Sequence, residues 1–183
     1  MKVYQWQKIH IIGGAGSGKT TLAKQLAAQL KIATCVDLDG VAWGPTGKVG
    51  LVERETAVRD ILAKPNWVTE GVFLWWTEPL FQAADAIIWL DLPFPLRAWR
   101  IVRRHLLASW RGDNPHGGLG NLYRFLVSVG KTHYAKTAPH PAGPDDDFAI
   151  TRLGMVQTLA PYQAKISHCQ TPIDVAQLLP PEK

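Results

Sequence analysis

Apolar residues follow two spacings in turn along this chain, and each spacing predicts a different element. Short uninterrupted apolar runs are typical of buried parallel strands, whereas apolar residues three or four positions apart are typical of amphipathic helices. The runs predict strands over residues 8–12, 34–37, 66–71, 86–90 and 165–169. The longer spacing predicts helices over residues 20–30, 53–64, 95–110, 119–138, 151–163 and 173–179.

Segments rich in glycine and proline separate several of these elements. They predict an irregular stretch over residues 40–50, a mobile loop over 111–120 and a turn over 139–147. Strands that alternate with helices imply a parallel sheet covered on both faces. We therefore predict a three-layer α/β/α fold with a five-stranded parallel sheet, formed as one domain by residues 1–183. Ligands of such folds bind at the carboxyl ends of the strands.

A glycine-rich segment lies between the first predicted strand and the first predicted helix. It reads Gly-Gly-Ala-Gly-Ser-Gly-Lys-Thr and fits the pattern G-x-x-x-x-G-K-[ST]. The glycines let the backbone curl until successive N–H groups point inward, at the positive end of the following helix. We call residues 13–20 the phosphate loop and predict that it binds a nucleoside triphosphate. The predicted contacts are Gly13, Gly14, Ala15, Gly16, Ser17, Gly18, Lys19, Thr20 and Thr21.

Two side chains of the phosphate loop have specific predicted roles. Lys19 is expected to reach the β- and γ-phosphates, and the Thr20 hydroxyl is expected to bind Mg²⁺. A plain glycine-rich turn would explain neither the lysine nor the hydroxyl. The expected cofactors are therefore ATP, or another nucleoside triphosphate, and Mg²⁺.

Carboxylates follow three of the predicted strands. Asp39, Glu70 and Asp91 each come at or just after the end of a strand, so they are expected to meet the phosphate loop at one edge of the sheet. Glu70 is interpreted either as a group that positions Mg²⁺ through water or as a carboxylate that binds a substrate. Asp39 is the best candidate for a general base if the second substrate offers a hydroxyl.

Composition limits the classes of protein that fit. The chain of 183 residues has two widely separated cysteines, Cys35 and Cys169, which form no metal-binding or CxxC pattern. Its beginning does not resemble a signal peptide, and no apolar run approaches the roughly 20 residues that cross a bilayer. We therefore expect a soluble cytoplasmic protein with reduced thiols that does not use a membrane.

The basic residues are concentrated in one segment. The net charge is +5, and within fifteen residues the chain has Arg97, Arg100, Arg103, Arg104 and Arg111, with His105 among them. Such a cluster forms a solvated helical face, binds a polyanion, or closes over a triphosphate during phosphoryl transfer. We favour the third interpretation because the chain also has a phosphate loop.

Tryptophan is unusually frequent, with eight residues in the chain. Trp67, Trp89 and Trp99 have apolar neighbours on predicted elements, so we expect them in the core. Three others follow the second and third strands in irregular segments and are candidates for stacking on a base or another flat ligand. These are Trp43, Trp75 and Trp76.

Several motifs together resemble a known family. They are the phosphate loop, Asp37-Leu38-Asp39 with Trp43 nearby, Trp67-Val68-Thr69-Glu70-Gly71, and Leu90-Asp91-Leu92-Pro93 followed by the arginine cluster. With these motifs, the chain resembles the adenylate-kinase-like P-loop proteins. Within that superfamily it looks most like the DNA topology modulation proteins, a group of small bacterial kinase-like proteins. The resemblance covers about residues 8 to 112 and the last strand and helix.

The resemblance implies a small-molecule kinase that transfers the γ-phosphoryl group of ATP to a nucleotide, nucleoside or other small acceptor. It places Arg100 and Arg104 on the nucleotide base and its phosphates, as catalytic residues beside Lys19 and Asp39. It implies an acceptor-binding segment over about residues 39–65 and a lid over about residues 104–120. The residues implied for the acceptor are Asp39, Trp43, Arg54, Glu70, Gly71 and Arg111.

The chain departs from adenylate kinases where those enzymes bind the phosphate of AMP. It has Val72-Phe73-Leu74 where adenylate kinases have Phe-Pro-Arg, so the sequence does not name the acceptor. Two alternatives stay open: a nucleotide-binding regulator that binds DNA without kinase activity, and a simple nucleoside triphosphatase. A nucleic acid is the less favoured partner, and the chain is expected to act as a monomer or a homodimer.

Overall fold

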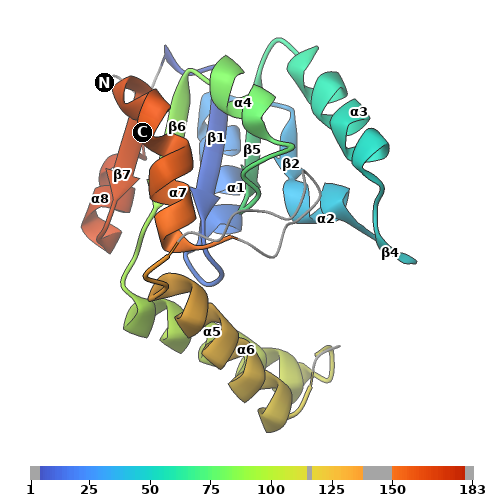
Figure 1. Ribbon diagram of the computed structural model, residues 1–183, viewed down its shortest axis with the longest axis vertical. Helices are drawn as coiled ribbons and strands as arrows, with labels where there is room; N and C mark the ends of the chain where they lie inside the picture. Colours follow the sequence, from blue (N-terminus) through green and yellow to red (C-terminus); the bar gives the residue numbers. More distant parts are fainter. Residues whose placement is uncertain (1–4, 115–116, 138–149, 180–183) are drawn as a thin grey trace.

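The computed structural model describes residues 5–114, 117–137 and 150–179, and a parallel sheet forms its centre (Figure 1). Five strands pair in the order β2-β5-β1-β6-β7. All of their pairings are parallel. The strands are β1 (Lys8–Gly13), β2 (Cys35–Asp37), β5 (Trp67–Gly71), β6 (Ala86–Leu90) and β7 (Ile166–Cys169). This sheet confirms the five predicted strands.

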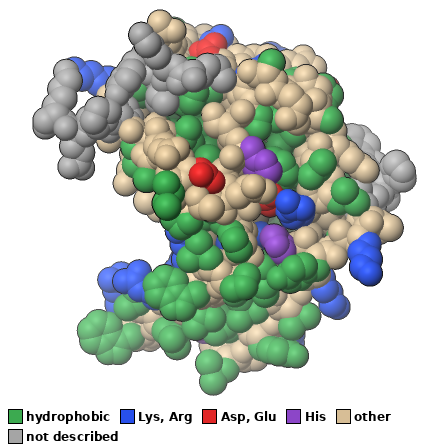
Figure 2. All heavy atoms as spheres, turned by 90° about the vertical axis from the view of Figure 1, so that its left-hand side faces the viewer, with side chains coloured by type: hydrophobic (Ala, Val, Ile, Leu, Met, Phe, Trp, Pro, Cys, Tyr) green, Lys and Arg blue, Asp and Glu red, His purple; other side chains and the backbone are tan. Residues whose placement is uncertain are grey.

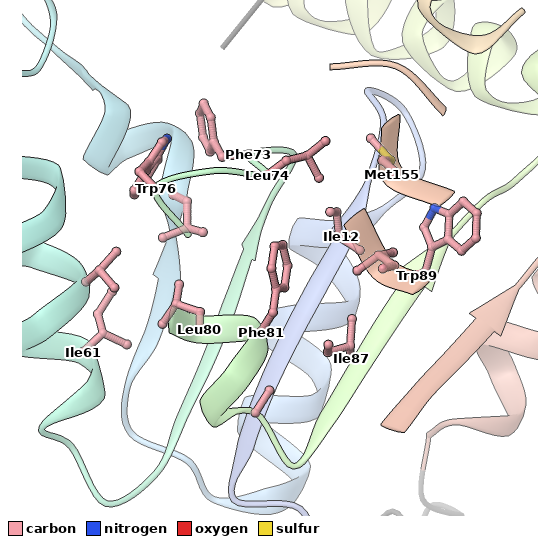
Figure 3. Close-up of a cluster of buried hydrophobic side chains, with 14 of the residues drawn as sticks. Ile12, Ile61, Phe73, Leu74, Trp76, Leu80, Phe81, Ile87, Trp89 and Met155 are labelled. Atoms are coloured by element: carbon pink, nitrogen blue, oxygen red, sulfur yellow. The ribbon is translucent and has the colours of Figure 1, made fainter. Parts of the chain in front are cut away.

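Helices cover both faces of the sheet. One face packs against α3 (Leu51–Leu62), α4 (Glu78–Ala83) and α7 (Arg152–Leu159), and Figure 3 shows part of the core between them. The other face packs against α1 (Lys19–Leu30) and α8 (Pro172–Gln177). The predicted three-layer α/β/α fold is therefore confirmed.

A pair of helices projects from the end of this body. Figure 1 shows α5 (Phe94–Arg111) and α6 (Leu119–His133) side by side below the carboxyl ends of the strands. We call residues 94–133 the helical hairpin. α5 follows β6 after Pro93, so its first turn lies beside the phosphate loop.

Some predicted boundaries were wrong. Residues 40–50 are not irregular throughout, because they include most of the short helix α2 (Leu38–Ala42) and the two-stranded hairpin of β3 (Trp43–Gly44) and β4 (Gly47–Lys48). α6 ends at His133, and α7 gives way at Ala160 to the 3-10 helix η3 (Ala160–Lys165). The sequence analysis missed α4, because its six residues are too few to show a helical period.

The tryptophans that are buried in the core are not all the ones that were predicted. Trp67 and Trp89 are buried in the core, as predicted. The prediction for Trp99 was wrong, since 59% of this residue is exposed on the outer side of α5. Trp76 is 4% exposed and packs against Phe73, so it is a core residue and is not available for stacking on a ligand. Trp43 is 46% exposed and stays a stacking candidate.

His10, in the centre of β1, is a buried titratable group. Its side chain is inaccessible to solvent, Nδ1 lies 2.8 Å from Oγ1 of Thr69, and the ring packs edge-on against Phe81. Burial lowers the pKa of His10 from 6.5 to about 3. The folded protein therefore keeps His10 neutral at pH values where the unfolded chain binds a proton.

Stability is expected to fall with acidity because of His10. Between about pH 6 and pH 4, protonation of His10 in the unfolded state should lower the free energy of unfolding by roughly 1.4 kcal/mol per pH unit. Urea unfolding at several pH values should show this slope in the wild type and in a His105→Asn control, and a smaller slope in His10→Asn. Equal slopes in all three proteins would contradict the assignment.

Candidate nucleotide-binding site

The phosphate loop connects β1 to α1 at the carboxyl edge of the sheet. Gly16 and Gly18 have φ angles of 76° and 97°, in the left-handed region that glycine adopts without strain. Gly18 is the N-cap of α1, and no side chain caps that helix end. The N–H groups of the first turn of α1 therefore face the hollow of the loop, where an anion would satisfy them.

Two arginines of α5 hold the outer side of this loop. Arg97 Nε donates to the Ala15 carbonyl oxygen at 2.9 Å, and Arg100 Nη1 donates to the Ser17 carbonyl oxygen at 2.9 Å. Each trans peptide unit directs its carbonyl and its following N–H in opposite directions. The two arginines thus orient the N–H groups of Gly16 and Gly18 toward the anion-binding side. We call Arg97 and Arg100 the arginine clamp.

The loop has no room for larger side chains beneath the clamp. A Cβ atom on Gly14 would lie 2.1 Å from Nη2 of Arg97, and one on Gly16 would lie 2.6 Å from the Arg97 carbonyl oxygen. Arg97 is 5% exposed, and its Nη1 also lies 3.2 Å from Nδ1 of His133 in α6. The phosphate loop and the helical hairpin therefore pack together directly.

Arg97→Ala is expected to weaken phosphate binding. Without the clamp the Ala15 carbonyl is no longer held, so the Gly16 N–H is free to turn away from the anion site, and affinity for inorganic pyrophosphate should fall at least about 10-fold. Calorimetric titration would measure this. Arg97→Lys should restore little, because one ammonium cannot replace the fixed guanidinium.

The matched control for this change is Arg103→Ala, in the same helix but away from the loop. It should leave the affinity for pyrophosphate unchanged. If Arg97→Ala lowered thermal stability but bound pyrophosphate as tightly as the wild type, Arg97 would be a structural residue only.

From the sequence, Arg100 and Arg104 were predicted as functional residues and Arg97 was not. Arg104 lies one turn further along α5 and lines a separate cavity of about 610 Å³ between α5 and α6. Arg111 is exposed at the end of α5. Contacts of Arg100, Arg104 and Arg111 with a nucleotide or acceptor stay predictions. Arg97 lies three residues before Arg100 on the same helix, and this spacing could have identified it as a second residue at the loop.

Lys19, Thr20 and Glu70 meet at the mouth of the phosphate loop. The Thr20 hydroxyl donates to Oε1 of Glu70, and Lys19 Nζ lies 3.9 Å from Oε2 of Glu70. Burial lowers the pKa of Lys19 and raises the pKa of Glu70, while the hydrogen bond from Thr20 and the charge of Lys19 oppose the shift in Glu70. Lys19 is 9% exposed, so an anionic phosphate beside it would meet a poorly hydrated cation.

This arrangement fits the predicted binding of Mg²⁺. The proton of the Thr20 hydroxyl is held by Glu70, so the lone pairs of that oxygen remain for a cation. Hydroxyl and carboxylate oxygens are the ligands that Mg²⁺ prefers, and it commonly keeps several waters between itself and the protein. Thr20 and Glu70 are thus suited to direct and water-mediated contact, respectively.

Asp39 stands opposite the phosphate loop, in the first turn of α2. Its N–H donates to Oδ1 of Asp37 at 2.9 Å, an N-cap bond that fixes the start of the helix and hence the position of Asp39. Burial raises the pKa of Asp39 above its ordinary value, against the opposing charge of Lys19. Asp39 and Lys19 line the same cavity, so the predicted juxtaposition is present.

That cavity has a volume of about 410 Å³ and extends from the phosphate loop toward α6 and α7. Its apolar wall includes Trp89, Val129 and Met155. Its polar wall includes Lys19, Asp39, Asp91, Arg97, His133 and Arg152. A cavity with an apolar wall and a few converging charges suits a small polar molecule next to the phosphate loop.

The remaining predicted acceptor residues do not line this cavity. Trp43 lies on β3, and Arg54 of α3 is fully buried with its guanidinium 5.3 Å from the Trp76 ring centroid. Gly71 ends β5, where a Cβ atom would lie 3.0 Å from Cβ of Leu38, so glycine allows α2 to approach the sheet. Their contact with an acceptor stays a prediction.

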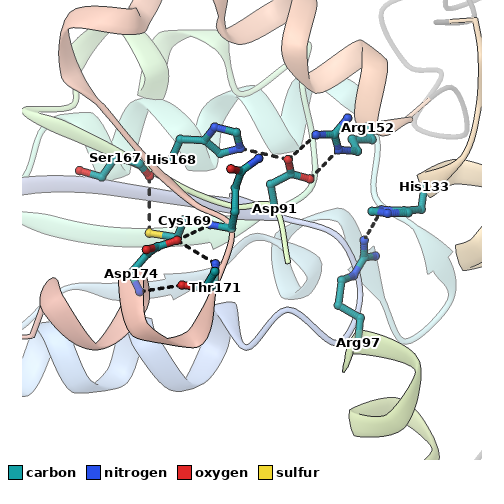
Figure 4. A network of polar contacts seen from close by, with 10 residues as sticks. Asp91, Arg97, His133, Arg152, Ser167, His168, Cys169, Thr171 and Asp174 are labelled. Carbon is teal, nitrogen blue, oxygen red and sulfur yellow. Dashed lines mark hydrogen bonds and ion pairs between the residues drawn. The ribbon is translucent and has the colours of Figure 1, made fainter. Parts of the chain in front are cut away.

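Asp91 is the centre of an ion-pair network that the sequence analysis did not foresee. Arg152 donates to both of its carboxylate oxygens at 2.7 Å, and Nε2 of His168 lies 3.0 Å from Oδ2 (Figure 4). Burial alone would raise the pKa of Asp91, but the bonds from Arg152 and His168 outweigh it and hold the pKa below its ordinary value. Asp91 therefore joins β6, β7 and α7 at the edge of the cavity.

Comparisons with known proteins give few matches in sequence. No protein-family model matches this chain. A stretch of 101 residues is 29% identical to the uncharacterized protein YqaC of Bacillus subtilis (strain 168), and it covers 54% of this chain and 56% of that protein. The match thus spans little more than half of that relative.

Similar solved structures were found at low identity. TT1252 from Thermus thermophilus has a TM-score of 0.49 and 13% identity, over 93% of this chain and 92% of that one. A shikimate kinase from Acinetobacter baumannii in complex with shikimate has a TM-score of 0.44 and 20% identity, over 88% and 97%. A gluconokinase from Sinorhizobium meliloti 1021 has a TM-score of 0.42 and 15% identity, over 86% and 97%. At these TM-scores, the function of this chain is inferred from its own residues.

Proposed function

We propose that this chain is a phosphotransferase that moves the γ-phosphoryl group of ATP, or a related nucleoside triphosphate, to a small acceptor. The observation that carries the proposal is the juxtaposition of two halves of a site. The phosphate loop, with Lys19 and Thr20, opens directly into the 410 Å³ cavity that also contains Asp39. A simple triphosphatase would require only the phosphate loop with Lys19 and Thr20.

The residues on the triphosphate side have separable tasks. The N–H groups of the loop and of the first turn of α1 bind the β- and γ-phosphate oxygens, and the arginine clamp keeps them pointed inward. Lys19 neutralises charge between the two phosphates. Thr20 and Glu70 hold Mg²⁺, which when bound neutralises charge on the triphosphate. Phosphoryl transfer depends almost entirely on such positioning and electrostatic stabilisation.

On the acceptor side we assign the general base to Asp39. A carboxylate that faces the phosphate loop can take the proton of an attacking hydroxyl, and its raised pKa improves it as a base. A phosphate acceptor would require no base. Water must be kept out during transfer, and we propose residues 104–120 as the lid that does so.

We further propose that residues 39–65 contribute to acceptor binding, with Trp43 as a stacking platform. We also propose that Arg100 and Arg104 contact the nucleotide and that Arg54, Glu70, Gly71 and Arg111 contact the acceptor. On the motifs given in the sequence analysis, we propose that the chain groups with the DNA topology modulation proteins. ATP as donor and the two free thiols, Cys35 and Cys169, fit a cytoplasmic location.

The rival function, DNA binding through the arginine cluster, finds less support. In that interpretation the arginines of α5 would face outward, toward DNA. Arg103, Arg104 and Arg111 are exposed, but Arg97 and Arg100 donate to the carbonyls of the phosphate loop. Their positions support a role in the binding of the triphosphate.

The proposal is tested by measuring ADP formation from MgATP in the presence of nucleosides, nucleotides and small hydroxy acids. A phosphorylated product formed from one acceptor class, together with faster ADP formation, would support it. ADP formation that no acceptor changes would indicate a simple triphosphatase. No binding of ATP or pyrophosphate at all would contradict the proposal.

A further inference from the structure

The net positive charge of this protein comes from the helical hairpin. Residues 94–133 include seven basic residues and one acidic residue, Asp113, for a net charge of +6. The whole chain has a net charge of +5, so the remaining residues together have a net charge of −1. Arg97 and Arg100 are held at the phosphate loop, so the exposed residues of the hairpin, five basic and one acidic, have a net charge of +4. A segment with this imbalance attracts an anionic partner.

The same hairpin exposes large apolar side chains. Trp99, Leu106 and Trp110 of α5 are 59%, 54% and 85% exposed. Spaced seven and four residues apart, they lie within about 40° of one another around the helix axis. Arg97 and Ile101, which are buried, lie on the opposite side of α5. The three exposed residues therefore form one outward stripe, which we call the α5 stripe.

α6 exposes apolar side chains of its own. Leu119 and Tyr123, one helical turn apart, are 74% and 70% exposed. Figure 2 shows hydrophobic side chains gathered over the lower lobe that the hairpin forms, with arginine and lysine side chains around its margin. Arg103 lies beside the α5 stripe, with its guanidinium 5.8 Å from the Trp99 ring centroid. Apolar area bordered by cations is the pattern of a surface that meets something both anionic and apolar.

Charge argues against a second copy of this chain as the partner. In a twofold dimer the same patch meets itself, so two hairpins that each have a net charge of +6 would face one another. A nucleic acid would balance the positive charge but would not cover the exposed leucine side chains. Its bases stack on aromatic rings within a positive groove, whereas Leu106 and Leu119 lie on outward helix faces.

We propose that the helical hairpin binds the surface of an anionic lipid membrane. The indoles of Trp99 and Trp110 and the side chain of Leu106 would enter the boundary between headgroups and acyl chains. Arg103, beside the stripe, would lie near the lipid phosphates. This is contact with a membrane surface. Among the helices of residues 5–114, 117–137 and 150–179, none has the length and apolar character to cross a bilayer.

The proposal differs from the expectation from the sequence that no membrane is used. Leu106 and Trp110 fall within residues 104–120, the proposed lid, but the α5 stripe lies on the opposite side of α5 from Arg97, which holds the phosphate loop. Binding to vesicles is also measured without ATP or an acceptor. Phosphoryl transfer could therefore fail its own test while binding to the membrane surface stands.

The test is sedimentation with vesicles of phosphatidylcholine alone or with about 30% phosphatidylglycerol. The wild type should bind the anionic vesicles at least about 10-fold more tightly than the neutral ones, with a blue shift of tryptophan fluorescence. Trp99→Gln/Leu106→Gln/Trp110→Gln should lose at least about 10-fold of that affinity. Arg103→Gln should weaken binding mainly at low salt.

The control is Val52→Gln/Ile173→Gln, which removes two apolar side chains that are 73% and 69% exposed elsewhere. It should bind vesicles as the wild type does. The proposal is overturned by equal binding to neutral and anionic vesicles, or by a triple variant that binds normally. The proposal is also overturned in two further cases, in both of which the wild type does not bind vesicles. In the first, the triple variant loses a dimer that light scattering detects in the wild type. In the second, the triple variant loses the binding of a single-stranded oligonucleotide.

Discussion

Lys19→Ala is expected to lower the rate of phosphoryl transfer by about 1000-fold or more. Lys19 lies at the mouth of the phosphate loop, it is 9% exposed, and its ammonium group lies 3.9 Å from Glu70. With alanine, the developing charge on the transferred group loses its closest compensation in a poorly hydrated site. Glu70 also loses the positive charge that opposes the rise in its pKa.

Steady-state assays with a fixed acceptor would measure this effect. Lys24→Ala is the matched control, since Lys24 lies in the same helix on an exposed face. It should retain wild-type turnover. Thermal unfolding of both variants should show that the fold survives. Normal turnover by a folded Lys19→Ala protein would contradict both the role of Lys19 and the proposed function.

Asp39→Asn is expected to lower turnover with a hydroxyl acceptor by about 100-fold. The amide occupies the same place next to Lys19 but cannot accept the proton. Affinity for a non-hydrolysable ATP analogue should change little, because Asp39 lies across the cavity from the loop that binds the phosphates. A loss in kcat without a loss in nucleotide affinity would separate a general base from a binding residue.

The pH profile gives an independent measure of the same assignment. Burial raises the pKa of Asp39 above 3.8, and the base acts only when it is ionised. In the wild type, kcat/KM should therefore decrease as the pH falls through that raised pKa. Asp39→Asn should lack this acid limb. If the limb persisted in the variant, a different group would be the base.

The phosphate loop was predictable because its chemistry is local. Gly16, Gly18, Lys19 and Thr20 lie within five consecutive residues, and the strand before them and the helix after them have clear periods. Parallel topology then places Glu70 at the same edge, because β5 pairs with β1 in register, with Gly71 opposite Ile12. The contact between Thr20 and Glu70 thus follows from one local motif and one topological rule.

The environment of the loop was only partly predictable. The arginine cluster is plain in the sequence, but which arginines reach the loop depends on the direction in which α5 leaves Pro93. The resemblance to adenylate kinases pointed to Arg100 and Arg104, and packing brings Arg97 and Arg100 to the loop carbonyls. The pairing of Asp91 with Arg152 joins residues 61 positions apart, and no local period indicates it.

The solvent exposure of individual tryptophans was predicted least well from the sequence. Trp99 has apolar neighbours in α5, and yet it faces outward because the buried side of that helix is used by Arg97 and Ile101. Trp76 follows a strand in an irregular segment, and yet it is a core residue against Phe73.

By itself, the amino-acid sequence determined the three-layer fold, the order along the chain of the five strands of its main sheet, and the phosphate loop. These depend on interactions between residues close in sequence, which leave a period or a motif. Only the tertiary structure decided that Arg97 orients the loop, that Asp91 binds Arg152, and that Trp99 and Trp110 face outward. Those contacts depend on how distant elements pack, and the free energy of packing is shared among many residues, so it leaves no local pattern.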